Sequence, residues 1–270
     1  MKLACLQLDV VFNDPTANVD LAIRELEKLK YDGVDLAVFP EAFVTGYCVE
    51  SLEDAKKISI PRDHPDLQRL SAAAARLQIG CIAGFAEDLN GELYNSVVLL
   101  ESGQAPRYYS KTHLPELGLD KFVRLGESIP VFETKWGRIG LLICFDLRHP
   151  EPMRILALGG ADLVILPTNW PEGAQIAAGP MTITRASENG IFLATCDRVG
   201  TENGFSFIGL SKIVSPRGKV LAEAGTGEEV IQAEIDLTEA REKRNVIIPG
   251  KYEITVFDSR RPELYSRLGK

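Results

Sequence analysis

The sequence predicts a layered α/β protein with a mixed β-sheet, because short apolar or β-branched runs alternate with amphipathic helical stretches along most of the chain. A second observation is the Asn90-Gly91 pair between two apolar runs, which is typical of a tight antiparallel hairpin. A third is a series of apolar runs near the end of the chain with no helix between them. Helical crossovers join parallel strands and tight turns join antiparallel ones, so both kinds of pairing are expected.

In the first half of the chain, the apolar pattern changes between the period of a strand and that of a helix. The pattern predicts strands at residues 3–9, 35–40, 79–87 and 94–101, and helices at residues 16–29 and 66–78. The last two of these strands lie on either side of the Asn90-Gly91 turn, and we expect them to pair with each other.

In the second half, the pattern predicts strands at residues 138–144, 161–166, 191–198, 207–215, 219–223 and 230–235, and helices at residues 151–158 and 180–189. Gly159-Gly160 ends the first of these helices, and residues 167–179 are expected to form a loop. No linker rich in Gly, Ser or Pro and no internal repeat divides the sequence, so a single domain over residues 1–270 is the simplest interpretation. Residues 247–270 lack clear periodicity and are expected to form an extended tail.

Composition and charge argue against two classes of function. The 270 residues are 45% hydrophobic and 25% charged, which is ordinary for a globular protein. No apolar run reaches the roughly 18 residues that a membrane-spanning helix needs, so we expect no membrane insertion. The formal net charge of −8 would repel nucleic-acid phosphates, and no stripe of Lys and Arg interleaved with aromatic residues reverses it locally. We therefore expect no nucleic-acid partner.

The N-terminus and the cysteines predict a cytoplasmic protein. The first apolar stretch reaches an acid at Asp9, so it is too short for a secretory signal and is interpreted as a strand. The cysteines are odd in number and widely spaced, which favours reduced thiols over a disulfide framework and permits one reactive thiol. They are Cys5, Cys48, Cys81, Cys144 and Cys196.

We infer neither a metal nor a cofactor. His64, His113 and His149 are far apart, and none forms a spaced ligand pair with Cys, Asp or Glu. The segment Gly225-Thr226-Gly227 lies between two predicted strands and is interpreted as a hairpin turn, not as a phosphate-binding loop.

Three residues that could carry chemistry follow apolar runs directly. Cys144 ends the predicted strand 138–144, where α/β folds commonly place reacting groups, and a thiol there needs a base or a positive charge to supply thiolate. Glu41 follows the predicted strand 35–40, and Lys111 lies in the segment 108–114, Tyr-Tyr-Ser-Lys-Thr-His-Leu. Each has an ordinary alternative, since cysteine often packs in cores and strand-end Glu and Lys are often solvated. Spacing alone leaves both interpretations open.

Resemblance to a known family favours the catalytic interpretation. Three segments resemble the three signature blocks of the nitrilase superfamily, in the family's order. They are residues 39–43 (Phe-Pro-Glu-Ala-Phe), 109–115 (Tyr-Ser-Lys-Thr-His-Leu-Pro) and 143–151 (Ile-Cys-Phe-Asp-Leu-Arg-His-Pro-Glu). Residues 160–171, 185–189 and 197–200 also resemble it, so nearly the whole chain is covered. The resemblance implies a four-layer αββα sandwich with mixed sheets.

The same resemblance implies a carbon–nitrogen hydrolase and assigns three roles. Cys144 would be the nucleophile, Glu41 the general base, and Lys111 the partner of the tetrahedral oxyanion together with the backbone N–H of Phe145. The expected reaction is hydrolysis of a small amide or N-carbamoyl compound through a Cys thioester, with release of ammonia. Nitrile hydrolysis needs the same thiol and lysine and stays open, as does a catalytically idle scaffold.

The sequence departs from the family pattern after the lysine. Many members have a second glutamate seven or eight positions further on, whereas Gly118 and Leu119 occupy those positions here. Two acids are near, and we favour Asp120 over Glu116 because Asp-Lys-Phe resembles the family's Glu-Lys-Phe.

Pocket walls and assembly are further expectations. Loops after the strands suggest four lining residues, although Trp170 could also be an ordinary packed aromatic residue. The four are Tyr47, Phe145, Asn169 and Trp170. The family's dimers pair sandwiches through helices, and the irregular tail fits a homodimer or a larger even-numbered oligomer.

Overall fold

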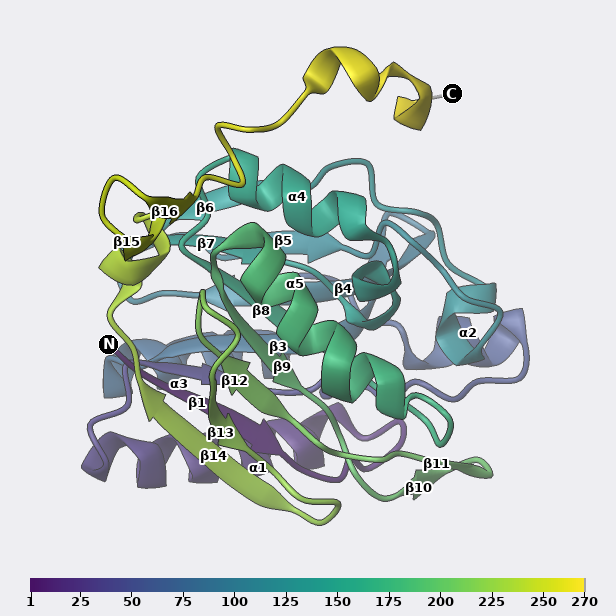
Figure 1. The fold of residues 1–270 in the computed structure, drawn as a ribbon. Coiled ribbons are helices and arrows are strands. Elements are labelled where there is room, and N and C mark those ends of the chain that lie inside the picture. Colours follow the sequence, from purple (N-terminus) through teal and green to yellow (C-terminus); the bar gives the residue numbers. More distant parts are fainter. Residues whose placement is uncertain (270) are drawn as a thin grey trace.

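The computed structural model describes residues 1–269 and arranges most strands in two six-stranded sheets (Figure 1). The first sheet has the order β14-β1-β2-β3-β4-β5. Its strands are β1 (Lys2–Gln7), β2 (Leu36–Val38), β3 (Gly80–Leu89), β4 (Glu92–Leu100), β5 (Arg107–Ser110) and β14 (Glu229–Glu234). β1, β2 and β3 are parallel, and the outer strands are antiparallel to their neighbours.

The second sheet repeats this plan, with a parallel centre and antiparallel edges. Its order is β13-β12-β9-β8-β7-β6. Its strands are β6 (Val131–Glu133), β7 (Arg138–Leu141), β8 (Leu163–Pro167), β9 (Phe192–Cys196), β12 (Lys212–Val214) and β13 (Val220–Glu223). Two small hairpins complete the strands: β10 (Thr201–Glu202) with β11 (Phe205–Ser206), and β15 (Asn245–Ile248) with β16 (Tyr252–Ile254).

Helices cover the outer faces of both sheets. They are α1 (Pro15–Tyr31), α3 (Pro65–Leu77), α4 (Pro150–Leu158) and α5 (Thr182–Asn189), whereas α2 (Leu52–Ile58) packs in a separate cluster with Tyr47, Ala86 and Leu93. α1 and α3 pack together over the first sheet, and α4 and α5 cover the second (Figure 1). The layers are therefore α, β, β and α, which confirms the four-layer sandwich with mixed sheets that the resemblance implied.

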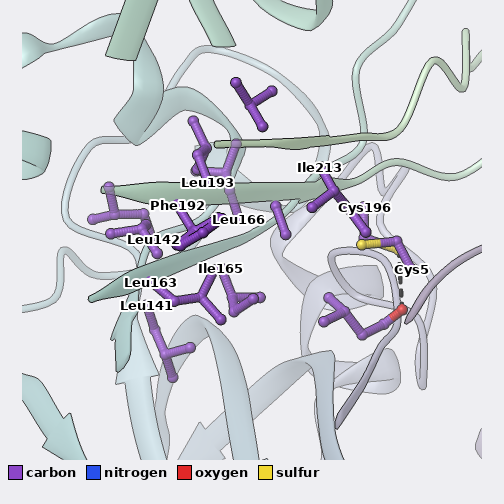
Figure 2. Close-up of a cluster of buried hydrophobic side chains, with 14 of the residues drawn as sticks. Cys5, Leu141, Leu142, Leu163, Ile165, Leu166, Phe192, Leu193, Cys196 and Ile213 are labelled. Atoms are coloured by element: carbon purple, nitrogen blue, oxygen red, sulfur yellow. Dashed lines mark hydrogen bonds between the residues drawn. The ribbon is translucent and has the colours of Figure 1, made fainter. Parts of the chain in front are cut away.

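Alternation along β1 shows how the sequence specifies these layers. Leu3 and Cys5 pack in the central core with residues of the second sheet, whereas Ala4 and Leu6 pack against α1 and α3. Successive side chains of a strand point to opposite faces, so a strand that is apolar at every position is buried on both sides. Figure 2 shows part of the central core, where the Cys196 thiol donates to the backbone oxygen of Val38 at 3.1 Å and links the two sheets.

The ends of two outer helices follow from local sequence. Asp14 caps α1 by accepting from the backbone N–H of Ala17 at 2.9 Å, and Pro15 occupies the first turn, where a missing N–H costs nothing. α3 begins in the same way with Pro65 after His64, whose ring accepts from the N–H of Asp66. Both helices therefore start one residue before the expected ranges.

Several expected boundaries are corrected by the structure. The strand expected at residues 138–144 ends at Leu141, and Cys144 itself adopts a positive φ, which lies outside the strand conformation. Of the strand expected at 207–215, only Lys212–Val214 pairs as a regular strand, since Gly209 and Leu210 also have positive φ. α2 was not expected, and α5 begins at Thr182 after a π-helical turn.

The C-terminal segment leaves the sandwich and runs past α4 (Figure 1). Within the expected tail, the structure contains the end of the β15–β16 hairpin and two 3₁₀ turns near residues 262–269. Lys270, the last residue of that tail, lies outside the described residues. Within residues 1–269, no helix is long and apolar enough to cross a lipid bilayer.

The topology brings the carboxyl ends of the parallel strands in both sheets towards one region. Glu41 comes shortly after β2, Cys144 comes shortly after β7, and Asp197 follows β9 directly. Ligands of α/β proteins usually bind at the carboxyl ends of parallel strands, so a functional site is expected in this region.

Candidate active site

Glu41 lies on a turn that rests on the neighbouring strand β3. A Cβ atom built on Gly84 would lie 2.3 Å from the backbone nitrogen of Ala42, so only glycine allows this approach. The N–H of Gly84 donates to Pro40 at 3.2 Å, and its carbonyl accepts from Val44 at 3.0 Å. The turn is therefore anchored on both sides, and the carboxylate of Glu41 is fully buried.

Lys111 directly follows β5 and is also fully buried. Its backbone N–H donates to the carbonyl of Asn95 at 2.8 Å, and its carbonyl accepts from Gly126 at 2.8 Å. Its Nζ lies 2.7 Å from Oε1 of Glu41 and 2.6 Å from Oδ2 of Asp120. The ammonium is thus held between two carboxylates, as a buried charge requires.

Asn95 and Tyr47 complete the polar network around this triad. Nδ2 of Asn95 donates to Oε1 of Glu41 at 2.7 Å and to Oδ1 of Asp120 at 2.8 Å. The hydroxyl of Tyr47 donates to Oδ2 of Asp120 at 2.8 Å. Oε1 of Glu41 therefore accepts from Asn95 and Lys111, whereas Oε2 has no partner among the described residues. Oε2 is the carboxylate atom available for proton transfer.

Cys144 begins a short 3₁₀ turn with a φ of +42°. This left-handed conformation costs a non-glycine residue roughly 1–3 kcal/mol and is frequent at functional sites. The carboxylate of Asp146 holds the turn, because its Oδ2 accepts from the N–H of Ile143 at 2.9 Å. Its Oδ1 accepts from the N–H of His113 at 3.0 Å. One buried carboxylate therefore connects the cysteine turn to the loop that follows Lys111.

The electrostatics favour a protonated thiol beside a base. Burial raises the pKa of the Cys144 thiol, the charge of Glu41 raises it further, and Lys111 acts in the opposite direction. Burial raises the pKa of Glu41, although Lys111 acts to lower it. Burial acts to lower the pKa of Lys111, but the carboxylates of Asp120 and Glu41 hold it well above its ordinary value. A thiol, a strengthened base and a fixed ammonium therefore act on one another.

The loop after β8 forms another side of the site. The hydroxyl of Thr168 and the backbone N–H of Asn169 lie beside the Cys144 thiol, where they act to lower its pKa. The N–H of Trp170 donates to Oδ1 of Asp197 at 2.7 Å, which joins this loop to the end of β9. Burial raises the pKa of Asp197 well above its ordinary value, against the opposing backbone hydrogen bonds from Trp170 and Arg198.

Of the two candidate supporting acids, the structure brings only Asp120 into the buried group. The 3₁₀ turn Gly118–Lys121 buries Asp120 beside Lys111, whereas Glu116 is exposed on the preceding loop. Glu116 is thereby corrected from a possible site residue to a solvated one.

The predicted pocket residues lie around the same region. Tyr47 contacts Asp120, and Asn169 and Trp170 are buried in the loop after β8. Trp170 also packs in the central core, so part of its role is structural. Phe145 is partly exposed next to Cys144, and its ring packs edge-on against His149 with the centroids 5.5 Å apart.

Four polar residues of the site were not predicted from the sequence: Asn95, Asp146, Thr168 and Asp197. Asn95 lies within the apolar strand β4, and a buried amide there is a signal that could have been noticed. Asp146 lies only two positions beyond Cys144, and Asp197 ends an apolar run as Glu41 does. Within residues 1–269, no three His, Cys, Asp or Glu side chains form a group that could hold a metal ion.

Comparison with known proteins identifies relatives over the full length of the chain. The sequence model of the Carbon-nitrogen hydrolase family matches residues 2–245. A probable nitrilase of Schizosaccharomyces pombe is 36% identical over 275 residues, which cover 99% of this chain and 98% of that protein. The 2-oxoglutaramate amidase of Bacillus subtilis is 32% identical over 268 residues, which cover 97% and 98% of the two chains.

A solved structure supports the same relationship. It is a variant of the amidase from Nesterenkonia sp. AN1 in which the acetamide moiety of fluoroacetamide is covalently added at the active-site cysteine. It matches this chain with a TM-score of 0.81 and 25% identity, over 99% of this chain and 96% of that one. The family match and the full-length relatives show that this chain belongs to the carbon–nitrogen hydrolase family of the nitrilase superfamily and is an enzyme of that class.

Proposed function

We propose that the enzyme hydrolyses the C–N bond of a small carboxamide through a thioester on Cys144. The observation that carries the proposal is the buried triad of Glu41, Lys111 and Asp120, in which the charges of Glu41 and Lys111 act on a cysteine held in a strained turn. A packing role needs neither the ammonium between two carboxylates nor the positive φ of Cys144. The amidases among the relatives support an amide over other C–N substrates.

In the first half-reaction, the Cys144 sulfur attacks the carbonyl carbon while Oε2 of Glu41, the oxygen without a protein partner, takes the thiol proton. Charge then develops on the carbonyl oxygen. The ammonium of Lys111 and the backbone N–H of Phe145 stabilise this oxyanion without reorganising, because both are fixed before substrate binds. Collapse breaks the C–N bond, Glu41 returns the proton to the leaving nitrogen, and ammonia leaves behind a thioester.

In the second half-reaction, Glu41 takes a proton from water, which attacks the thioester carbon. The C–S bond breaks, the carboxylic acid leaves, and Cys144 regains its proton. Asp120 and Asn95 do not react in either step. They hold Lys111 and Glu41 in place through the hydrogen bonds between 2.6 and 2.8 Å described above.

An N-carbamoyl compound presents the same carbonyl flanked by nitrogen and fits the same steps. Nitrile hydrolysis is the second candidate, and it is favoured by the name of the fission-yeast relative. A nitrile would form a thioimidate on the same sulfur and would add one water before ammonia leaves. The polar residues of the site serve both reactions, so a direct assay has to separate them.

The test is ammonia release from a panel of short amides, N-carbamoyl amines and nitriles, with Cys144→Ala as the control. We expect the wild-type enzyme to release ammonia from amides, and the Cys144→Ala variant to release none. Release from nitriles alone would replace the amidase proposal by the nitrilase one. If no compound in the panel released ammonia and Cys144 reacted with iodoacetamide no faster than an exposed model thiol, a scaffold without catalysis would be the better account.

We also propose that the enzyme is a cytoplasmic homodimer, or a larger assembly of such pairs, joined through α4 and the C-terminal segment. Ile155 and Leu158 of α4 are 48% and 49% exposed, and they line a groove of about 560 Å³ together with Val256 and Tyr265. The cytoplasm fits the five cysteines, which are all buried and free of disulfide bonds.

The assembly is tested by light scattering of Ile155→Glu. A charge in the interface should convert the dimer to a monomer. Leu52→Glu, at a site of similar exposure (47%) on α2, should leave the mass unchanged. A wild-type monomer at micromolar concentration would refute the proposal.

A further inference from the structure

Several buried polar atoms near Cys144 have no hydrogen-bond partner in the part of the chain that is described. They are Oε2 of Glu41, Oδ1 of Asn95, Oγ1 of Thr168, both amide atoms of Asn169 and Oδ2 of Asp197. Such atoms cost free energy unless water or a ligand satisfies them. The mechanism uses Oε2 of Glu41, but it leaves Asn169 and Asp197 without a role. Both are almost completely buried, at 1% and 0% exposure.

Asp197 is tied to the loop that flanks the nucleophile. Its Oδ1 accepts from the N–H of Trp170 at 2.7 Å, and its own N–H donates to the hydroxyl of Ser211 at 2.8 Å. The residue before Trp170 is Asn169, whose backbone N–H acts on the Cys144 thiol. Asp197 is therefore hydrogen-bonded to the residue that follows Asn169, and the backbone N–H of Asn169 lies beside the reacting sulfur.

The charges around Asp197 disfavour a carboxylate there. The nearest basic side chain in sequence, Arg198, acts to lower the pKa of Asp197, but it is fully buried and already paired with Glu202 at 2.6 Å and with Asp9 at 2.9 Å. The charge of Glu41 acts on Asp197 from the first sheet and opposes a second negative charge. Burial acts in the same direction and raises the pKa of Asp197 well above its ordinary value.

We propose that Asp197 is a neutral carboxylic acid whose Oδ2–H, together with the amide of Asn169, hydrogen-bonds the acyl chain of an uncharged polar amide. This inference deepens the proposed amidase function and depends on it. In this arrangement Oδ1 keeps the N–H of Trp170 as its donor, and Oδ2 offers a proton that a carboxylate would lack. Asn169 adds one donor site and one acceptor site, so the acyl chain meets both kinds of polar partner.

The restriction to uncharged substrates follows from the buried cations. Among the described residues, every fully or nearly fully buried Lys and Arg side chain already has a carboxylate partner. Lys111 pairs with Glu41 and Asp120, Arg198 with Glu202 and Asp9, and Lys212 with Glu223. A carboxylate on the acyl chain would find no free cation among these buried side chains, and an unpaired buried charge is strongly disfavoured. An amide of the same length carries no such penalty.

Succinamide and succinamate form a matched pair for this test, because they differ mainly in a terminal amide against a terminal carboxylate. We expect the wild-type kcat/KM to be at least about tenfold higher for succinamide, well beyond the factor of about two that its second amide contributes. Equal values, or a preference for succinamate, would overturn the restriction to uncharged acyl chains.

The role of Asp197 is tested with Asp197→Asn and Asp197→Ala on succinamide. Asparagine keeps an acceptor for Trp170 and a donor in place of Oδ2–H, so its kcat/KM should stay within about threefold of wild type. Alanine should raise KM and lower kcat/KM about tenfold or more. Asn169→Ala should have a similar effect. The matched control is Asn189→Ala, a buried asparagine on α5 that also has an unpartnered Oδ1, which should leave kcat/KM unchanged.

A second measurement reports the protonation state without any substrate. An acid whose pKa is raised by folding stabilises the protein at low pH, and this contribution is lost as pH rises towards the folded-state pKa. Asp197→Asn removes the titration. The melting temperature of this variant should therefore rise relative to wild type as pH increases from 5 to 7. A difference that stays constant over this range would show that Asp197 is ionised throughout.

The outcomes separate this inference from the proposed function. If Cys144 is required for amide hydrolysis but Asp197→Asn loses as much activity as Asp197→Ala, the amidase stands and the neutral acid is refuted. The same holds if Asp197→Ala and Asn169→Ala change stability but leave kcat/KM at the wild-type value. If Asp197→Ala does not fold, Asn169→Ala and the pH series with Asp197→Asn decide the matter.

Discussion

The Nζ atom of Lys111 lies 2.6 Å from Oδ2 of Asp120, although an aspartate is one methylene shorter than the glutamate that the family pattern led us to seek. The backbone makes up the difference. Gly118 adopts a φ of +48° and packs against Tyr47, and the N–H of Leu119 donates to the Tyr47 carbonyl at 2.9 Å. This turn places Asp120 within hydrogen-bonding distance of the Lys111 ammonium.

Removing Asp120 should therefore weaken catalysis strongly. Asp120→Ala leaves Lys111 with one carboxylate partner and removes one hydrogen bond from each of Tyr47 and Asn95. Breaking a buried ion pair costs about 3–5 kcal/mol of free energy. We expect Lys111 to move from its position as a result. We expect kcat/KM to fall by about 100-fold or more, measured by ammonia release. Glu116→Ala, an exposed acid on the same loop, should change it by less than about twofold; full activity of Asp120→Ala would contradict the assignment.

Gly84 should tolerate no side chain. A Cβ atom there would lie 2.3 Å from the nitrogen of Ala42 and 2.8 Å from Cα of Glu41. Gly84→Ala should lower the free energy of unfolding by about 1–3 kcal/mol, the usual cost of overpacking, and reduce kcat by displacing Glu41. Gly227→Ala, where no atom lies within 4 Å of the added carbon, serves as the control in denaturant titrations. Equal stability of the two variants would show that the turn is not anchored as described.

Asp146 should be more important for the cysteine turn than any one of its partners. Besides the two backbone N–H groups, it accepts from the hydroxyls of Tyr109 at 2.7 Å and Thr112 at 3.0 Å. Its Oδ1 also lies 2.8 Å from Nδ1 of His113. Asp146→Ala removes the acceptor from all these groups, at about 1–3 kcal/mol for each one that stays buried and unsatisfied. Tyr109→Phe removes a single bond and should cost only about 1 kcal/mol. Comparable losses of kcat in the two variants would argue against the connecting role of Asp146.

The pH dependence of kcat/KM should reveal the raised pKa of Glu41. The base works as a carboxylate, so activity is lost as pH falls through its pKa. Because burial raises that pKa above its ordinary value of 4.5, the acid limb should begin at a higher pH than for an exposed glutamate. A profile that stays flat down to about pH 5 would indicate that Glu41 is not the titrating base.

The sequence allowed Glu41, Lys111 and Cys144 to be chosen as candidate site residues because each follows an apolar run. The signature blocks, which occur in the family's order, supported the choice. The layers were accessible as well, since continuous apolar strands have to be covered on both faces. The early end of the strand expected to reach Cys144 could not be predicted, because the positive φ of Cys144 is not visible in residue types. Short helix α2 has too few turns to show a period.

Asn95 illustrates what the sequence could not show. Its side chain bridges Glu41, 54 residues away, and Asp120, 25 residues away, and neither separation has a sequence signature. A polar residue within a strand usually predicts an outward-facing position, yet Asn95, like the adjacent Ser96, is fully buried. Only the pairing of β4 with β5, which places Lys111 beside the Asn95 backbone, reveals its role.

The most direct test of the central claim is the mass of the Cys144 peptide after rapid acid quenching of the enzyme during turnover of a short amide such as propionamide. We predict that a fraction of this peptide carries one propionyl group as a thioester, and that hydroxylamine removes it. The adduct should be absent when the enzyme is quenched without substrate. Ammonia release with no acyl group on Cys144, or with the acyl group on another residue, would contradict the role of this cysteine as nucleophile.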